Sequence, residues 1–157
     1  SLMKGKICEE NFMKAAIAQA VRAGEIDEVP IGAVAVLGDK IIARAHNLRE
    51  KKQDPLGHAE ILLIEKAAKK LKSWRLDGVT IYVTCEPCLM CAGAILQSRV
   101  KRVVFGCLDP KAGAVGSLFD LSNDKRLNHR FEVKSGVMAK RCADLLSEFF
   151  RRKRKEK

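Results

Sequence analysis

Two short strings constrain this chain more than anything else in its sequence, because together they supply three metal-binding side chains and one carboxylate. They are His58-Ala59-Glu60 and Pro87-Cys88-Leu89-Met90-Cys91, about thirty residues apart. One histidine and two cysteines can bind a single ion only if the fold brings the two strings together. Structural zinc sites fill all four coordination positions with protein ligands, whereas catalytic sites leave the fourth to water or substrate. Three ligands therefore predict a catalytic zinc site with an open position.

The composition predicts one globular domain in a reducing compartment. The chain has 157 residues, 47% of them hydrophobic, which is ordinary for a folded domain. Six cysteines suggest disulfides, but the N-terminus carries no hydrophobic secretion signal and a core of this size needs no cross-links. We therefore expect a cytoplasmic protein. The least charged stretch, Val79 to Ser98, is interrupted by Glu86-Pro87, which argues against a membrane span.

The charge favours a polyanionic partner. Thirty Lys and Arg against nineteen Asp and Glu give a net charge of +11, and such an excess attracts nucleic acid. It is unevenly placed, because residues 151–157 hold six basic side chains and one acidic one.

Hydrophobic periodicity predicts strands that alternate with helices. The helices are expected at Glu9–Ala23, from about His58 to Leu71, from Pro87 in the first turn to near Ser98, and at Met138–Phe150. The strands are expected at Ile31–Leu37, Lys40–Ala45, Val79–Thr84, Arg102–Gly106 and Phe131–Ser135. Gly38-Asp39 joins the first two strands as a hairpin. The connection Cys107–Arg130, in which we expect a short helix, is long enough for a parallel crossover. The pattern indicates one α/β domain with a mixed sheet.

Both metal-binding strings fall at predicted helix starts. Side chains in the first turn of a helix point toward and beyond its N-terminus, and Cys88 and Cys91, three residues apart, share one face. Two helix N-termini would then converge on one ion, and their partial positive charge favours the thiolates that bind zinc.

Cys85 is the one neighbour that would change this interpretation. Its spacing from Cys88 equals that of Cys88 from Cys91, so a closed site with three cysteines and one histidine is the alternative. Because Cys85 ends a strand and precedes Glu86-Pro87, it cannot share the helical face of the other two, and we expect a buried or pocket-lining thiol.

Glu60 is the expected proton carrier. A water activated by zinc still needs a group that takes its proton and delivers it to the substrate, although a carboxylate could instead only orient a ligand. The other histidines, His46 in a strand pattern and His129 in a polar loop, are expected to be structural.

With Ala92-Gly93-Ala94 after the second string, the two strings resemble the zinc-dependent nucleoside deaminases, and among them the bacterial tRNA-specific adenosine deaminases. The resemblance covers about residues 9–150, so residues 3–150 are expected to form a zinc-dependent deaminase domain and residues 151–157 a basic C-terminal tail; Ser1-Leu2 ahead of Met3 is expected to be a cloning remnant. The matching segments outside the strings are Val29-Pro30-Ile31-Gly32-Ala33-Val34, Asn47, Asp54-Pro55, Arg75-Leu76, Arg102-Val103-Val104-Phe105-Gly106, Asp109, Lys111, Gly113-Ala114, Gly116-Ser117-Leu118 and Asn128-His129-Arg130. The chain departs from the family at Leu56-Gly57, where Thr-Ala is frequent, and at Cys85, where Leu is common.

The resemblance implies a cytidine-deaminase-like three-layer α/β sandwich, with a mixed five-stranded sheet flanked by helices, one Zn²⁺ per subunit and commonly a homodimer. It implies that His58, Cys88 and Cys91 bind zinc, that activated water attacks C6 of adenine, and that Glu60 moves the proton. The product would be inosine, and the substrate the wobble adenosine in the anticodon stem-loop of a tRNA.

Four further residues are expected to contact the substrate: Asn47, Ala59, Pro30 and Asp109. For Asn47 a structural turn role remains the alternative, and for Asp109 the capping of a loop.

The C-terminal tail and the aromatic residues just before it are expected to contact RNA, through Phe149, Arg151 and Arg152. RNA phosphates attract Lys and Arg, and unpaired bases stack on aromatic rings. The alternative is a solubilising helix end whose phenylalanines pack inward.

Two other functions are left open. The same zinc chemistry serves deaminases of a free base or nucleoside, of the cytosine, guanine or cytidine type. A non-catalytic, zinc-stabilised RNA-binding module would instead have Cys85 in the metal shell and no need for Glu60.

Overall fold

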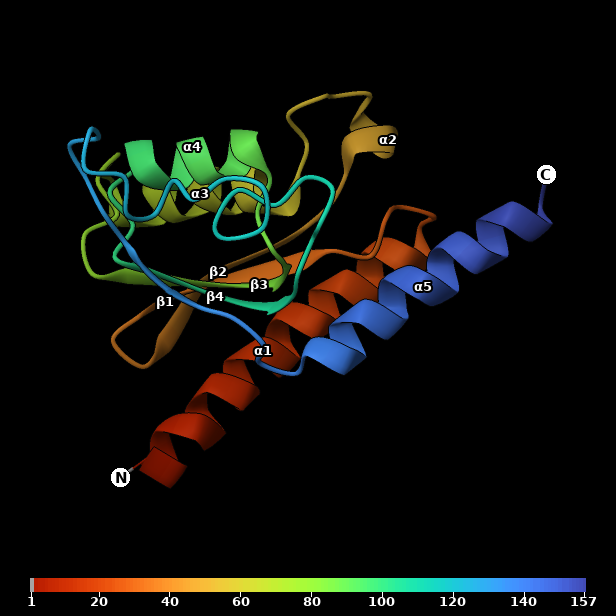
Figure 1. The fold of residues 1–157 in the computed structure, drawn as a ribbon, viewed down its shortest axis with the longest axis horizontal. Helices are drawn as coiled ribbons and strands as arrows, with labels where there is room; N and C mark the ends of the chain where they lie inside the picture. The colour runs from red at the N-terminus through yellow and green to blue at the C-terminus, as the bar shows by residue number, and fades with distance from the viewer. Residues whose placement is uncertain (1) are drawn as a thin grey trace.

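A mixed five-stranded sheet forms the middle of the molecule in the computed structural model, which describes residues 2–157 (Figure 1). Its strands are β1 (Gly32–Leu37), β2 (Lys40–His46), β3 (Val79–Cys85), β4 (Arg102–Cys107) and β5 (Glu132–Lys134), in the order β2-β1-β3-β4-β5. β1 pairs antiparallel with β2 and β3, whereas β4 pairs parallel with β3 and β5. The expected hairpin, parallel crossover and mixed sheet are confirmed. Ser1, half of the expected cloning remnant, lies outside the described residues.

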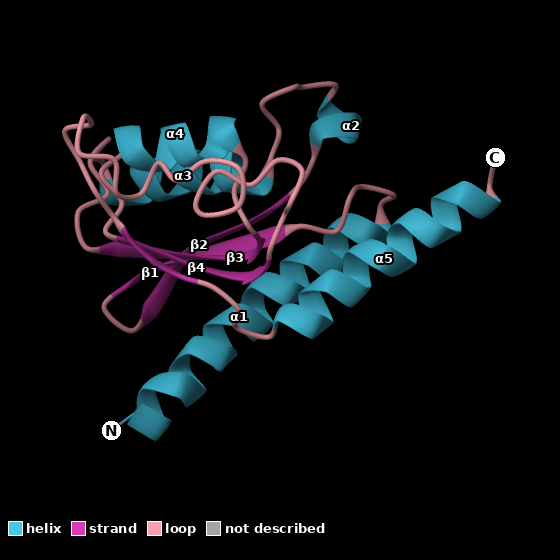
Figure 2. Cartoon of the chain, in the orientation of Figure 1, coloured by secondary structure: helices cyan, strands magenta, loops and turns pink. Residues whose placement is uncertain are grey.

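Helices cover both faces of the sheet and make three layers (Figure 2). α3 (Ala59–Leu71) and α4 (Leu89–Gln97) lie side by side on one face, and the long helices α1 (Leu2–Glu25) and α5 (Ala139–Lys155) lie on the other. Along the chain, the short α2 (Arg49–Lys52) comes after β2 and before α3. None of the helices within residues 2–157 combines the length and the apolar character that crossing a membrane requires.

Each face of the sheet has its own hydrophobic core, because side chains alternate between the faces along a strand. Val103 packs into the core beneath α3 and α4, and its neighbour Val104 into the core against α1 and α5. Burial on both faces explains why these strands are nearly continuous apolar runs in the sequence. Gly32 allows the closest approach between layers, since a Cβ there would lie 2.2 Å from the Ala16 carbonyl oxygen of α1.

The parallel pairing of β3 with β4 places the loops that follow these strands at the same end of the sheet. Cys85 at the end of β3 pairs with Cys107 at the end of β4, so the loops that follow both strands start side by side. Ligand sites in α/β sheets form at such carboxyl ends.

The structure corrects three expected boundaries and one expected element. α5 ends at Lys155 rather than Phe150, so most of the expected tail is helical. α1 begins at Leu2 rather than Glu9, because Met3 to Cys8 are exposed on that helix and carry no periodic apolar signal. Pro87 lies before α4 rather than in its first turn, since Cys88 is the extended N-cap residue. The short helix expected within Cys107–Arg130 is wrong, because that segment consists of turns and isolated bridges.

Glu9 links α1 to the strands β4 and β5. Its carboxylate accepts hydrogen bonds from Arg102 of β4, at 2.8 Å, and from Lys134 of β5, and its side chain is 15% exposed. Burial alone would raise the pKa of Glu9, but the hydrogen bonds from Lys134 and Arg102 outweigh it and lower that pKa.

We expect Glu9→Gln to lower the free energy of unfolding by about 1 kcal/mol, and therefore the Tm by roughly 2–4 °C. Because the folded-state pKa is lowered, the difference should be present above the ordinary pKa of 4.5 and vanish as the pH falls through the folded-state value. Thermal melts between acid and neutral pH measure this, with Glu10→Gln as the matched control. Equal melting temperatures for all three proteins at neutral pH would contradict it.

Candidate active site

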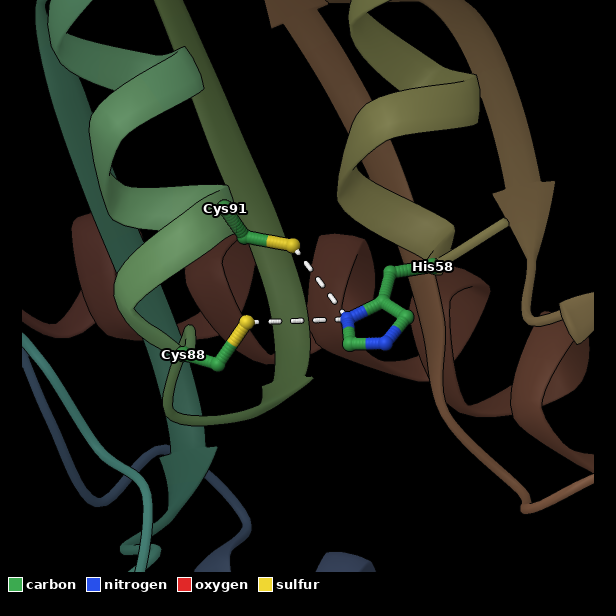
Figure 3. Close-up of side chains that lie close together, drawn as sticks. All are labelled: His58, Cys88 and Cys91. Carbon is green, nitrogen blue, oxygen red and sulfur yellow. Dashed lines mark hydrogen bonds between the residues drawn. The ribbon is translucent and has the colours of Figure 1, made fainter. Parts of the chain in front are cut away.

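Three side chains from two helix N-termini converge on one point (Figure 3). His58 is the N-cap residue of α3, and Cys88 is the N-cap residue of α4, both with extended backbone; Cys91 lies in the first turn of α4. The Nδ1 atom of His58 lies 3.6 Å from Cys88 Sγ and 3.5 Å from Cys91 Sγ. The candidate ligand atoms all lie within 4.8 Å of one another.

This triangle suits a metal ion. With Zn–S bonds of about 2.3 Å and Zn–N bonds of about 2.0–2.1 Å, tetrahedral nitrogen and sulfur ligands lie about 3.5 Å apart. The two separations of 3.6 and 3.5 Å between His58 Nδ1 and the sulfur atoms match that distance. One imidazole and two sulfurs are also the donor types that zinc prefers.

The surroundings favour the ionised form of a sulfur ligand. The contact with the Cys91 thiol, aided by the His58 ring, lowers the pKa of Cys88 to about 4. The positive ends of α3 and α4 act in the same direction. At neutral pH the site therefore presents a thiolate, which is the form that binds metal.

Glu60 lies beside the three candidate ligands in the first turn of α3. Its side chain is 4% exposed, and burial raises its pKa to about 7. Its carboxyl group contacts the Cys91 thiol. A buried carboxyl group next to a metal triangle is placed to exchange protons with a ligand of the metal.

A cavity of about 160 Å³ opens onto His58, Glu60 and Cys88. Val29 and Ile31, which precede β1, form one wall, and Asp109 and Ala112, which follow β4, form another. An apolar cavity with a few convergent polar groups is typical of a small-molecule binding site.

Cys85 lines this cavity but is not part of the ligand cluster found among residues 2–157. It is 6% exposed, and its thiol contacts Cys107 on the neighbouring strand. This contact, together with burial, raises the pKa of Cys85, so the thiol stays protonated. The placement is that of a pocket-lining thiol, which leaves three candidate ligands.

Three of the four expected substrate-contacting residues line the cavity: Asn47, Ala59 and Asp109. The Asn47 side chain also bonds to the backbone, donating to the Val29 carbonyl at 3.3 Å and accepting from the Arg49 N–H at 3.1 Å. Asp109 accepts from the N–H groups of Lys111 and Ala112, both at 3.2 Å. Both residues therefore shape the loops that carry them.

The remaining expected residues lie elsewhere. Pro30 is buried and lines a groove with Gly24 of α1 and Leu145 of α5. Phe149 and Arg152 are also at this groove, and Arg151 is exposed on α5. His46 contacts Gln19, and His129 contacts the Val100 carbonyl, so neither takes part in the site.

Sequence reasoning missed Arg49 and Glu86 as cavity-lining residues. The sequence contained a hint for Glu86, because this acidic residue lies directly between the apolar strand that ends at Cys85 and the string Pro87–Cys91. Arg49 offered none beyond its place in a polar, basic segment.

Comparison with known proteins identifies the family. The MafB19-like deaminase family matches residues 7–154. The tRNA-specific adenosine deaminase of Bacillus subtilis is 55% identical over 149 residues, which cover 95% of this chain and 92% of that protein. This chain belongs to the tRNA-specific adenosine deaminases.

Solved structures agree with this family and with the expected fold. One, from studies of A-to-I editing by tRNA:A34 deaminases at the wobble position of transfer RNA, is similar to this deaminase with a TM-score of 0.84 and 43% identity, covering 87% of this chain and 99% of that one. The guanine deaminase of Bacillus subtilis is similar with a TM-score of 0.61 and 30% identity, over 74% of this chain and 85% of that one. The three-layer, cytidine-deaminase-like architecture is thereby confirmed.

We expect Cys88→Ser to abolish stoichiometric metal binding by this deaminase and Cys85→Ser to leave one metal ion per chain. The reason is that Cys88 is a corner of the ligand triangle and Cys85 is not. Metal content of the purified variants, measured by mass spectrometry, checks this, with Cys142→Ser as a control for losing a buried thiol. Loss of metal in Cys85→Ser would mean that the site is closed.

Proposed function

We propose that this chain converts adenosine to inosine at the wobble position of tRNA anticodon loops, with one Zn²⁺ held by His58, Cys88 and Cys91. The observation that carries the proposal is the three-cornered ligand set with a buried carboxyl group beside it, in a chain of this family. His58, Cys88 and Cys91 would hold the ion, and three protein ligands are the number that catalytic zinc sites have.

The reaction exchanges an amino group for an oxygen: adenosine and water give inosine and ammonia. When bound, zinc supplies Lewis-acid activation of water. The Glu60 carboxylate takes a proton from the water and places it on N1 of the adenine ring, then carries a second proton to the departing amino group. A base must leave its stack to reach such a cavity, and Val29 and Ile31 give the cavity apolar walls.

We expect Glu60→Gln to lower the rate of inosine formation by about 10²–10⁴-fold, because the amide cannot exchange a proton. Zinc content and RNA affinity should stay at the wild-type level, since Glu60 is not a corner of the ligand triangle. Single-turnover assays on an anticodon stem-loop measure the rate, with the exposed Glu65→Gln on the same helix as the control. Surviving activity would contradict the proton-carrier role, and loss of zinc would make Glu60 structural.

The C-terminal end of α5 supplies a surface for RNA next to the cavity. A second cavity, of about 480 Å³, is lined by Phe149, Phe150 and Lys153 and shares Val29 and Arg49 with the first. Phe150 is 45% exposed and offers its ring for stacking, whereas Phe149 is 7% exposed and packs inward, with the Arg152 guanidinium 5.3 Å from its centroid. Arg152 and Lys153 also pair with Asp27, at 3.6 and 2.6 Å. We propose that nucleotides flanking the target adenosine bind here.

Truncation after Phe150 should weaken binding of the stem-loop and flatten its salt dependence. For single strands, the logarithmic salt slope falls by roughly 0.7 for each lost phosphate contact. Titrations at several salt concentrations measure both quantities. The control is Lys69→Ala with Lys70→Ala, in the last turn of α3, the end of that helix away from the cavity. Equal losses in both proteins would show that only total charge matters.

We further propose a homodimer whose interface borders the cavity. Leu56, Leu89 and Leu108 are 53%, 53% and 60% exposed, and each lies within two residues of a residue that lines the cavity. Apolar side chains gathered around a site mark a contact surface, and a second copy would cover them. Sedimentation of the purified protein measures the assembly.

A cytoplasmic location is also proposed, since a reducing compartment preserves thiolate ligands.

A second candidate is the deamination of a free base, favoured by the likeness to a guanine deaminase. The two functions share the metal chemistry and differ in how much of the substrate is bound. A free-base enzyme has no use for a basic helix end beside its cavity. Faster turnover of free guanine or cytosine than of RNA would decide for this candidate.

A further inference from the structure

The Glu86 carboxylate is buried at the mouth of the loop between β4 and β5. It is 3% exposed and follows β3 directly. Its Oε1 accepts a hydrogen bond from the Asp109 N–H at 3.1 Å, and its Oε2 accepts from the N–H groups of Val115 and Ser117 at 3.3 and 2.9 Å. The Ser117 hydroxyl donates a fourth hydrogen bond. All four donors belong to one loop, residues 108–118, which we call the wall loop.

The wall loop is also bound to the segment that carries a metal ligand. The Ala114 N–H donates to the Pro87 carbonyl at 2.9 Å, and Gly113 forms an isolated bridge with Cys88. The same loop supplies Asp109 and Ala112 to the cavity. Part of the loop therefore borders the substrate space, and Glu86, which also lines the cavity, holds the backbone of the loop in place.

Gly113 is part of this arrangement. A Cβ at Gly113 would lie 2.2 Å from Oε2 and 2.4 Å from Oε1 of Glu86. The wall loop can reach the carboxylate only because this position has no side chain. A carboxylate accepts hydrogen bonds and donates none, so it is suited to a cluster made only of donors, which offsets the cost of its burial.

We propose that Glu86 is a positioning residue, which fixes the wall loop so that Asp109 and Ala112 hold the substrate base against the metal ligands. The proposal rests on the proposed function for its substrate, but not for its effect on the loop. Glu86 acts through backbone N–H groups. A glutamine at this position has one NH₂ group in place of an acceptor oxygen, so it would face at least one of these N–H groups with another donor. That N–H group would lose its hydrogen bond, and the loop would be held less tightly.

The test is Glu86→Gln in the zinc-loaded protein, with two readouts. Hydrogen exchange at the amides of Asp109, Val115 and Ser117 should accelerate by about tenfold or more, which is what the loss of one buried hydrogen bond permits. The KM for the anticodon stem-loop should rise about tenfold while kcat stays within about threefold, because a loosened wall weakens substrate binding. Unchanged exchange at these amides would overturn the proposal, as would a fall in kcat with KM unchanged or a loss of zinc.

Two further variants keep the test decisive if Glu86→Gln does not fold. Ser117→Ala removes only the hydroxyl donor and should raise KM by a smaller factor in the same direction, and Gly113→Ala should displace the loop while the carboxylate remains. Asp124→Asn is the matched control: Asp124 also accepts a backbone N–H, from Arg126 at 2.9 Å, in the same connection, and should leave KM and kcat unchanged. A wild-type protein without activity on RNA would contradict the proposed function, whereas the exchange measurement would still test Glu86.

Discussion

The structure depends on the meeting of two helix N-termini at one point. His58 starts α3 and Cys88 starts α4, and the separations of their donor atoms match a tetrahedral metal site. Without a cation, a cluster of thiolate and imidazole groups would be costly to bury. A bound metal ion would therefore cross-link the starts of α3 and α4 and contribute to folding. The antiparallel pairing of β1 with both β2 and β3 makes this possible, because it places the end of β3, which leads to Cys88, at the same end of the sheet as the end of β2, which leads to α3.

Two buried carboxylates outside the metal centre hold the walls of the cavity. Glu86 binds the backbone of the wall loop on one side. Glu28, 1% exposed, accepts from the N–H groups of Glu50 and Lys51 at 3.1 and 2.7 Å, in the short helix that carries Arg49. The wall loop is irregular, and α2 is a single helical turn whose first N–H groups have no partner within the helix, so in both segments backbone N–H groups find side-chain acceptors. Two walls of the cavity are thus fixed through hydrogen bonds from their backbone N–H groups to buried carboxylates.

The sequence predicted the elements that local patterns determine. The helices after His58 and Cys88 were predicted from apolar periodicity, although the second begins after Pro87 rather than with it, and the hairpin was predicted from Gly38-Asp39. The conformation of the Cys107–Arg130 connection could not be predicted, because its backbone is held by Glu86, more than twenty residues away in sequence. The place of Pro30, packed between α1 and α5, is likewise set by tertiary contacts. The candidate metal ligands could be identified from the sequence because each lies at the start of a helix. The role of Asn47 could not, because it depends on which atoms of its side-chain amide are hydrogen-bonded to the backbone.

We propose that the candidate metal centre and the RNA surface beside it act on one substrate. The most direct measurement compares kcat/KM for a stem-loop bearing a wobble adenosine with kcat/KM for free guanine, on the same zinc-loaded protein. The account predicts that inosine forms in the stem-loop at a rate far above any turnover of guanine, and only when zinc is present. Faster deamination of guanine, or inosine formation that survives complete removal of the metal, would contradict it.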